Sequence, residues 1–146
     1  TIATTNQFAD FQNTFLRSDC FVNQMLSIGI DLIEVSRVQT SIAQYGERFL
    51  QRVFTPRELA YCKGQPPQLA ARFAAKEAVS KALGVGVQHI DGVGWREIEI
   101  VSGARGKPAV QLSGRAAQRA TEIGLHTIEI SLAHTREHAI AMVVAE

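Results

Sequence analysis

Residues 70–83 read Ala70-Ala-Arg-Phe-Ala-Ala-Lys-Glu-Ala-Val-Ser-Lys-Ala-Leu83 and predict a helix at the centre of the fold. At 100° per residue, one side of this helix collects small side chains, namely Ala71, Ala74, Ala75, Ala78, Val79 and Ala82. Such a side can approach a neighbouring element closely. The other side presents one carboxylate among several cations, from Arg72, Phe73, Lys76, Glu77, Ser80 and Lys81. An alternative interpretation of Glu77 and Lys81 is an exposed i, i+4 ion pair, worth only ~0.3–0.5 kcal/mol.

The segments before this helix predict one strand and two further helices. Ser27–Ile33 alternates and predicts a strand with Ile28, Ile30 and Leu32 on one face. We expect Ser36 to cap a first helix, which Gly46 ends. Residues 55–58, Thr-Pro-Arg-Glu, form a capping box that begins a second helix. Pro66 and Pro67 are then expected to break the chain before the third helix, which runs from about residue 68 to residue 83.

The segments after the central helix predict four strands and one helix. Residues 95–101 and 109–112 are expected strands around a glycine-rich turn, and Ser113 is expected to cap a helix ending near Gly124. Residues 126–132 and 138–144 predict a final hairpin. The order β-ααα-ββ-α-ββ has too few helical crossovers for a parallel sheet. We therefore predict an α+β fold, with a small, mainly antiparallel sheet packed with helices.

Asp31 lies in the middle of the apolar strand, an unusual place for an unpaired carboxylate. Gly29 shares its face and should leave room beside it. One interpretation is a buried aspartate paired with an arginine or lysine, and the other is a ligand for a hard cation. Two carboxylates, Asp31 and Glu77, are too few for a closed calcium cage but suit Mg²⁺, which keeps waters and binds substrate phosphates. The cations around Glu77 would then indicate a pyrophosphate-type ligand.

Composition excludes several classes of protein. The 146 residues carry a formal net charge of +1, which gives no global basic field for nucleic-acid binding. Hydrophobic residues make up 46%, enough for one packed domain, and no apolar run approaches the ~20 residues that span a bilayer. The segment from Val35 to Arg72 holds six basic and two acidic residues, a net of +4. It predicts an acidic partner or a phosphate-bearing ligand, unless it is an ordinary solvated surface.

Residues 1–24 are polar and mixed, and we expect them to be an extension without assigned function before a domain at residues 25–146. Phe8, Phe11 and Phe15 recur at a helical spacing that fits a short amphipathic helix. The segment lacks the pattern of a secretory signal. Cys20 and Cys62 have no zinc-binding spacing, so we interpret both as free thiols of a cytoplasmic protein.

Four motifs follow one another in residues 25–146: Gly29-Ile-Asp-Leu-Ile-Glu34, Arg72-Phe-Ala-Ala-Lys-Glu-Ala78 with Lys81-Ala-Leu-Gly84, Gly106-Lys-Pro108, and Ser131-Leu-Ala-His-Thr135. In this order they resemble the signatures of holo-acyl-carrier-protein synthases, the short type of 4′-phosphopantetheinyl transferase. The F-A-A-K-E-A-x-x-K-A block at residues 73–82 is the most specific of them.

The resemblance implies a Mg²⁺-dependent enzyme of fatty-acid biosynthesis. It would transfer the 4′-phosphopantetheine arm of coenzyme A to a serine of an apo acyl carrier protein, or of a carrier domain of a fatty-acid synthase, and release adenosine 3′,5′-bisphosphate. By the same resemblance Asp31 and Glu77 would bind the metal, Lys81 would act beside the pyrophosphate, and Arg37 would contact the carrier. Further contacts to coenzyme A would come from Arg72, Gly106, Lys107, Pro108, Ser131, His134 and Thr135.

The resemblance also implies a homotrimer with sites between subunits, so we expect the Gly106–Pro108 turn of one subunit near Glu77 of the next. Attack by the carrier serine builds charge on phosphate oxygens, which Mg²⁺ and Lys81 can stabilise. The base would be Glu77 or a water held by the metal. Two other functions fit the residues: a Mg²⁺-dependent transferase or hydrolase that acts on a nucleotide pyrophosphate without a carrier, and a non-catalytic coenzyme-A-binding module.

Overall fold

A computed structural model describes residues 26–146 of the chain, so the expected helix with Phe8, Phe11 and Phe15, and the thiol of Cys20, lie outside the described residues. The strands are β1 (Ser27–Glu34), β2 (Ile98–Ser102), β3 (Pro108–Leu112), β4 (Ile128–His134) and β5 (His138–Ala145). The helices are α2 (Val35–Tyr45), α3 (Glu47–Val53), α4 (Pro56–Cys62), α5 (Pro66–Ala82) and α6 (Gly114–Glu122), with a 3₁₀ turn η1 (Trp95–Glu97). The predicted α+β class and the antiparallel pairing are confirmed, but the strands form two sheets, of three and two strands, where we expected one.

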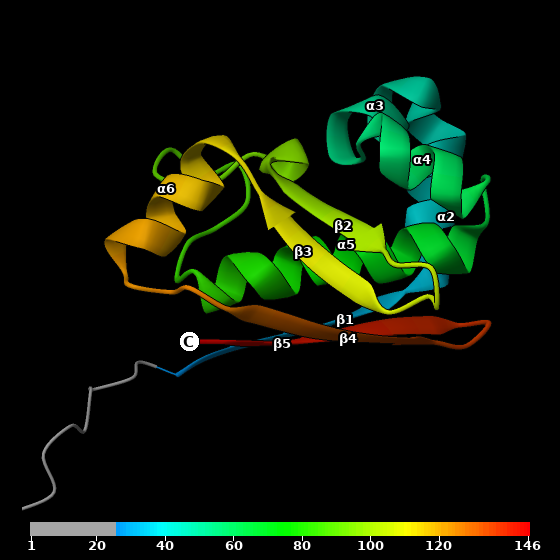
Figure 1. The fold of residues 1–146 in the computed structure, drawn as a ribbon. Coiled ribbons are helices and arrows are strands. Elements are labelled where there is room, and N and C mark those ends of the chain that lie inside the picture. Colours follow the sequence, from blue (N-terminus) through cyan, green and yellow to red (C-terminus); the bar gives the residue numbers. More distant parts are fainter. Residues whose placement is uncertain (1–25) are drawn as a thin grey trace, which may run out of the picture.

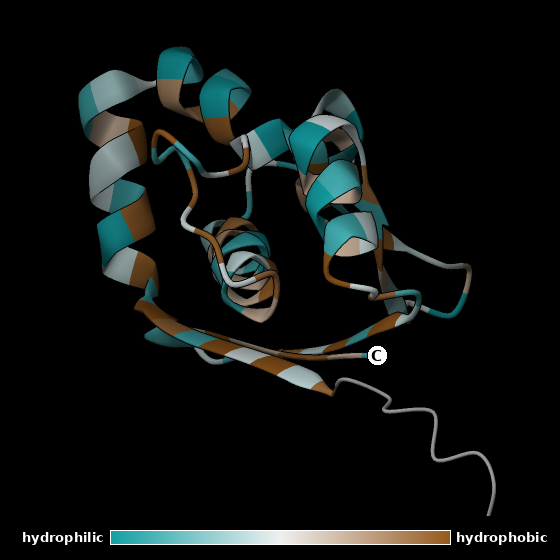
Figure 2. Ribbon diagram, turned by 90° about the vertical axis from the view of Figure 1, so that its left-hand side faces the viewer, coloured by the Kyte–Doolittle hydropathy of each residue, from teal (hydrophilic) through white to brown (hydrophobic). Residues whose placement is uncertain are grey.

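Helix α5 is the centre around which the other elements pack. An antiparallel sheet of order β1-β5-β4 covers one side of α5, and the β2–β3 ribbon lies across the other side (Figure 1). Viewed nearly end-on, α5 is enclosed by the sheet below and by helices and loops around it (Figure 2). Between Leu69 and Ala82, three positions are not fully buried: Phe73, Glu77 and Lys81. These residues, spaced four apart, form one line along the helix, which we name the open stripe.

The small residues of α5 allow the close approach to the sheet that the sequence predicts. All five alanines of the predicted small side are buried. At Gly29 of β1, an added Cβ would fall 1.8 Å from the carbonyl oxygen of Ala78, so only glycine fits there. The prediction that Gly29 leaves room beside Asp31 is therefore wrong, because the α5 backbone fills that space.

Several local boundaries differ from the sequence prediction for identifiable reasons. Helix α2 begins at Val35 rather than after Ser36, and the Val35 N–H donates instead to the carbonyl of Glu137. Pro66 and Pro67 begin α5 rather than break the chain, because the first turn of a helix needs no N–H partner within the helix. Helix α3 was not predicted, and the first part of the expected strand at residues 95–101 is the turn η1. The capping box of α4 is confirmed, with Thr55 N–H donating to Glu58 Oε2 at 2.8 Å.

The face of the three-stranded sheet that points away from α5 is apolar and exposed. Ile28, Ile30 and Leu32 of β1 lie on it, and Ile30 and Leu32 pair with Met142 and Ile140 of β5. These five side chains are 36–62% exposed. We name this surface the outer face. None of the helices in residues 26–146 has the length and apolar content needed to cross a bilayer.

Candidate functional site

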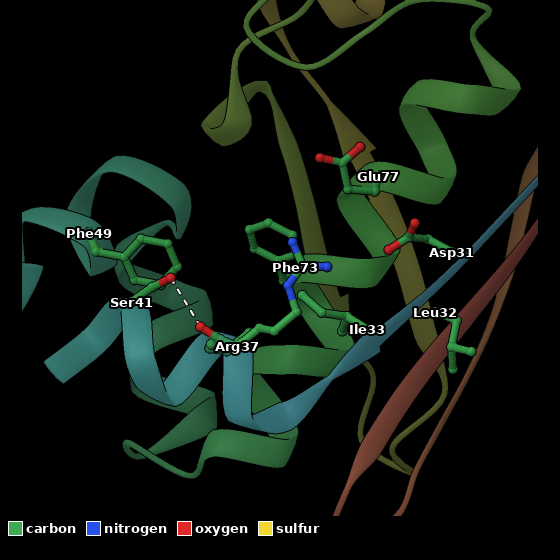
Figure 3. Close-up of a pocket in the computed structure, with 9 residues that line it drawn as sticks. Asp31, Leu32, Ile33, Arg37, Ser41, Phe49, Phe73 and Glu77 are labelled. Carbon is green, nitrogen blue, oxygen red and sulfur yellow. Dashed lines mark hydrogen bonds between the residues drawn. The ribbon is translucent and has the colours of Figure 1, made fainter. Parts of the chain in front are cut away.

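The open stripe of α5 meets β1 and α2 at a cavity of about 300 Å³. Asp31 of β1 and Glu77 of α5 line it together, and Figure 3 shows their carboxylates side by side. Arg37 of α2 and Phe73 of the open stripe complete the same wall. The structure thus brings two predicted metal ligands and the predicted carrier-binding arginine to one place, although Asp31 and Glu77 lie far apart in the chain.

Asp31 and Glu77 have different electrostatic surroundings. Burial raises the pKa of Glu77 above its usual value, and the negative charge of Asp31 raises it further, while Lys81 and His89 oppose the shift. Lys81 Nζ forms an ion pair with Asp31 Oδ1 at 2.9 Å and donates to the carbonyl of Ile30, also at 2.9 Å. The pair of carboxylates therefore has a local excess of negative charge that one lysine only partly balances.

A divalent cation fits this donor set. Two carboxylates that face one cavity and repel each other would be stabilised by a positive ion between them. Residues 26–146 contain no group of three or more histidine, cysteine or acidic side chains placed to hold a metal. A pair of carboxylates is a donor set that Mg²⁺ uses, since this ion keeps several waters and takes one or two protein carboxylates.

A second, more aromatic cavity of about 500 Å³ adjoins the first, and Phe49 and Phe73 line both. Phe73 packs on Trp95 with ring centroids 4.7 Å apart, and Arg48 and Arg52 stand at the edge. The sequence did not predict this cavity, because its walls come from α2, α3, α5 and η1. Its arginines belong to the basic segment that the sequence did single out.

The prediction that Arg72 and Lys76 lie on an open, cation-rich side of α5 is wrong. Their residues are 2% and 0% exposed. Lys76 Nζ pairs with Glu58 Oε2 at 2.9 Å and donates to the carbonyls of Trp95 and Ile98. Burial lowers the pKa of Lys76, and Glu58 opposes the shift. A helical wheel places charges outside by default, and it contains no information about the carboxylate that α4 brings to this position.

Arg72 belongs to a second polar group near the start of α5. Its guanidinium donates to Gln68 Oε1 at 3.2 Å and to Ser102 Oγ at 3.1 Å, and it lies 4.2 Å over the ring of Tyr61. Gln68 Nε2 lies 3.4 Å from His134 Nε2, so this group connects Arg72 with His134. The buried Arg72 Nε has no hydrogen-bond partner among the described residues.

Cys62, next to Arg72, is a buried free thiol, as predicted. Burial raises the pKa of Cys62 to about 11, and the Arg72 charge opposes the shift. The thiol is thus un-ionised near neutral pH.

The remaining predicted contacts to coenzyme A lie away from the cavity of Asp31 and Glu77. Gly106, at φ +78°, lies in the β2–β3 turn, and Pro108 is the first residue of β3. In the same turn, Lys107 Nζ forms an exposed ion pair with Glu129 at 3.1 Å. Thr135 closes the β4–β5 turn by accepting from the backbone N–H of His138 at 3.1 Å. Ser131 lies on the outer side of the sheet, opposite Met142. None of these residues lines the cavity of Asp31 and Glu77 within the described chain.

Comparison with known proteins identifies the class. A family model described as the 4′-phosphopantetheinyl transferase superfamily matches residues 27–143, so the chain belongs to this superfamily. A relative named holo-[acyl-carrier-protein] synthase from Dehalococcoides mccartyi is 48% identical over 122 residues, covering 84% of this chain and 99% of the relative. Another protein of that name, from Herpetosiphon aurantiacus, is 46% identical over 124 residues, covering 82% and 98%.

Solved structures agree with these relatives. The crystal structure of Helicobacter pylori holo-[acyl-carrier-protein] synthase in complex with coenzyme A has a TM-score of 0.74 and 30% identity, covering 82% of this chain and 99% of that one. The corresponding structure from Neisseria meningitidis has a TM-score of 0.73 and 34% identity, covering 82% and 97%. The resemblance to holo-acyl-carrier-protein synthases is therefore confirmed.

Proposed function

We propose that this chain transfers the 4′-phosphopantetheine arm of coenzyme A to the serine of an apo acyl carrier protein, or of a carrier domain of a fatty-acid synthase. The observation that carries this proposal is the meeting of Asp31 with Glu77 and Lys81 of the open stripe at one cavity. Such a cavity offers carboxylates for a cation and a lysine for a phosphate. Membership of the family indicates which substrates match this chemistry, namely coenzyme A and an acyl carrier protein.

Asp31 and Glu77 would hold Mg²⁺. When bound, the ion would withdraw charge from the pyrophosphate oxygens of coenzyme A. Lys81, half exposed beside Asp31, is placed to donate hydrogen bonds to the same oxygens. Arg37 adds a second cation on the cavity wall, where it could contact either the phosphates or an acidic residue of the carrier.

The reaction forms a bond between the serine oxygen and the β-phosphorus and breaks the bond from that phosphorus to the bridging oxygen. Adenosine 3′,5′-bisphosphate leaves with the bond's electron pair. The serine proton passes to Glu77 or to a water beside it.

We further propose a homotrimer with sites shared between subunits. Within one chain, the Gly106–Pro108 turn does not line the cavity of Asp31 and Glu77. A neighbouring subunit could bring this turn to Glu77, so that Lys107 reaches the nucleotide. The outer face, with five exposed apolar side chains, gives the surface that such an assembly would bury.

The other predicted residues have complementary roles in this proposal. Arg72 and His134, joined through Gln68, would bind a phosphate of coenzyme A, with Ser131 and Thr135 as further contacts. Residues 25–146 would form the transferase domain and residues 1–24 an extension, in keeping with a family match that starts at residue 27. We place the reaction in the cytoplasm, where a free thiol such as Cys62 persists.

Chromatographic assay of adenosine 3′,5′-bisphosphate tests this function. The protein would be incubated with coenzyme A and Mg²⁺, with and without an apo acyl carrier protein. We expect the nucleotide to be released only with the carrier, and not with a carrier whose modified serine is replaced by alanine. Release without any carrier would instead indicate a hydrolase, and coenzyme A binding without release would indicate a binding module.

A further inference from the structure

Lys81 forms an ion pair with one of the two carboxylates of the cavity. Its Nζ contacts Asp31 Oδ1 and the Ile30 carbonyl, both at 2.9 Å. The Lys81 side chain is 51% exposed, whereas that of Asp31 is 19% exposed. The ion pair therefore joins a half-exposed ammonium group to a mostly buried carboxylate.

A divalent cation held by Asp31 and Glu77 would compete with this contact. The ammonium group lies 2.9 Å from Asp31 Oδ1, and its positive charge would repel the ion. In residues 26–146, Lys81 is the basic residue that forms an ion pair with Asp31, while Arg37 lines the cavity without one. A phosphate of coenzyme A would compete with Asp31 for the ammonium group of Lys81.

We propose that Lys81 blocks the cation site of the free protein and is drawn away by the phosphates of coenzyme A, so that cation and coenzyme A bind cooperatively. This inference rests on the proposed function, because it assumes that coenzyme A binds at this cavity. Lys81 is suited to the exchange, since it ends a flexible four-carbon stem and the carboxylate that it leaves is only partly exposed. Cooperativity is reciprocal, so bound cation must also favour coenzyme A.

The expected size follows from the ion pair. A pair with one half-exposed partner changes an equilibrium constant by a factor of about 1.4 to 5, and a positive charge beside a divalent ion adds repulsion that solvent partly screens. Replacing Lys81 by methionine should therefore tighten cation binding to the coenzyme-A-free protein by about 3- to 20-fold. Coenzyme A should still raise the cation affinity of this variant through its own phosphates. The factor by which it does so should be about 3- to 20-fold smaller than in the unaltered chain.

Mn²⁺ serves as the probe, with free Mn²⁺ measured by electron paramagnetic resonance and no carrier present. Three full-length proteins would be titrated with and without saturating coenzyme A: the unaltered chain, Lys81→Met, and the matched control Lys63→Met, whose lysine is exposed at the end of α4. Lys81→Gln would be titrated as a second neutral variant. We expect tighter Mn²⁺ binding without coenzyme A in both Lys81 variants, and no change in Lys63→Met.

Unchanged or weaker Mn²⁺ binding in the coenzyme-A-free Lys81 variants would overturn the proposal. So would an equal effect in Lys63→Met, since it would show a general effect of charge. Calorimetry that detects no binding of coenzyme A to the unaltered chain would refute the proposed function instead. The comparison without coenzyme A would still decide whether Lys81 blocks the cation site.

Discussion

Replacing Lys76 by methionine should lower the free energy of unfolding by about 3–5 kcal/mol, the usual cost of breaking a buried ion pair. Lys76 and Glu58 are both 0% exposed, and their charged atoms lie 2.9 Å apart. The substitution leaves the Glu58 carboxylate without its countercharge. It also removes the donor to the carbonyls of Trp95 and Ile98, each of which costs about 1 kcal/mol or more if it stays unpaired.

Two features keep this loss from being larger. Glu58 still accepts from the backbone N–H groups of Thr55 and Ile100, each at 2.8 Å, so the carboxylate is not left without partners. Methionine fills nearly the same volume as the lysine stem, so no large cavity forms. Adding Glu58→Gln removes the stranded charge, and the double variant should therefore lose about 1–3 kcal/mol less than the sum of the two single losses.

Urea unfolding, followed by circular dichroism at one fixed subunit concentration, measures these changes. The control is Lys63→Met, an exposed lysine whose replacement should change stability by no more than about 0.5 kcal/mol. A loss below about 1 kcal/mol in Lys76→Met, or strict additivity in the double variant, would refute the buried-pair reasoning.

Four further predictions concern the site and its assembly. Asp31→Ala should abolish transfer with an unchanged circular dichroism spectrum, and full activity would remove Asp31 from the site. Glu77→Gln should also abolish transfer, yet it should raise the melting temperature of the cation-free protein at pH 7. In the unaltered chain, the raised pKa of Glu77 means that the folded state holds the carboxyl proton more tightly than the unfolded chain does. Ionisation of Glu77 therefore lowers the stability of the folded state as pH rises above 4.5. A gain in the melting temperature of Glu77→Gln that persists unchanged below pH 4.5 would contradict this reasoning. Arg37→Glu should raise the KM for the carrier far more than the KM for coenzyme A, since charges at the rim of an interface mainly speed association. The activity of this variant should also be less sensitive to salt. Equal effects on both KM values would mean that Arg37 serves coenzyme A or the fold. Met142→Asp, in the outer face, should dissociate the proposed homotrimer in light scattering, and an active monomeric unaltered chain would rule out the shared site.

Elements with local signals in the sequence were predictable. The alternation of residues 27–33, the capping box at Thr55 and the hairpin of residues 126–144 each depend on contacts within a few residues or across one turn. Helix α3 has no such signal, because Gly46 both ends α2 and precedes α3. Its existence depends on packing that the sequence pattern does not reveal.

The candidate site was predictable in its residue types but not in its geometry. Asp31 and Lys81 are 50 positions apart, and their ion pair depends on how α5 lies on β1. The burial of Lys76 depends likewise on Glu58, which arrives from another helix. The sequence around Glu58 does not indicate that its second carboxylate oxygen accepts a hydrogen bond from the Ile100 N–H. Nor does it indicate that the charge of Glu58 balances that of a lysine in the core.

Intact-mass spectrometry of the carrier measures the transfer of phosphopantetheine itself. An apo acyl carrier protein would be incubated with coenzyme A, Mg²⁺ and this protein, with the Asp31→Ala variant as the matched control. We expect the carrier to gain the mass of one 4′-phosphopantetheine group on its serine, and the carrier incubated with Asp31→Ala to stay unmodified. An unmodified carrier in the presence of the folded, unaltered protein, or modification at the same rate by Asp31→Ala, would contradict the proposed transfer.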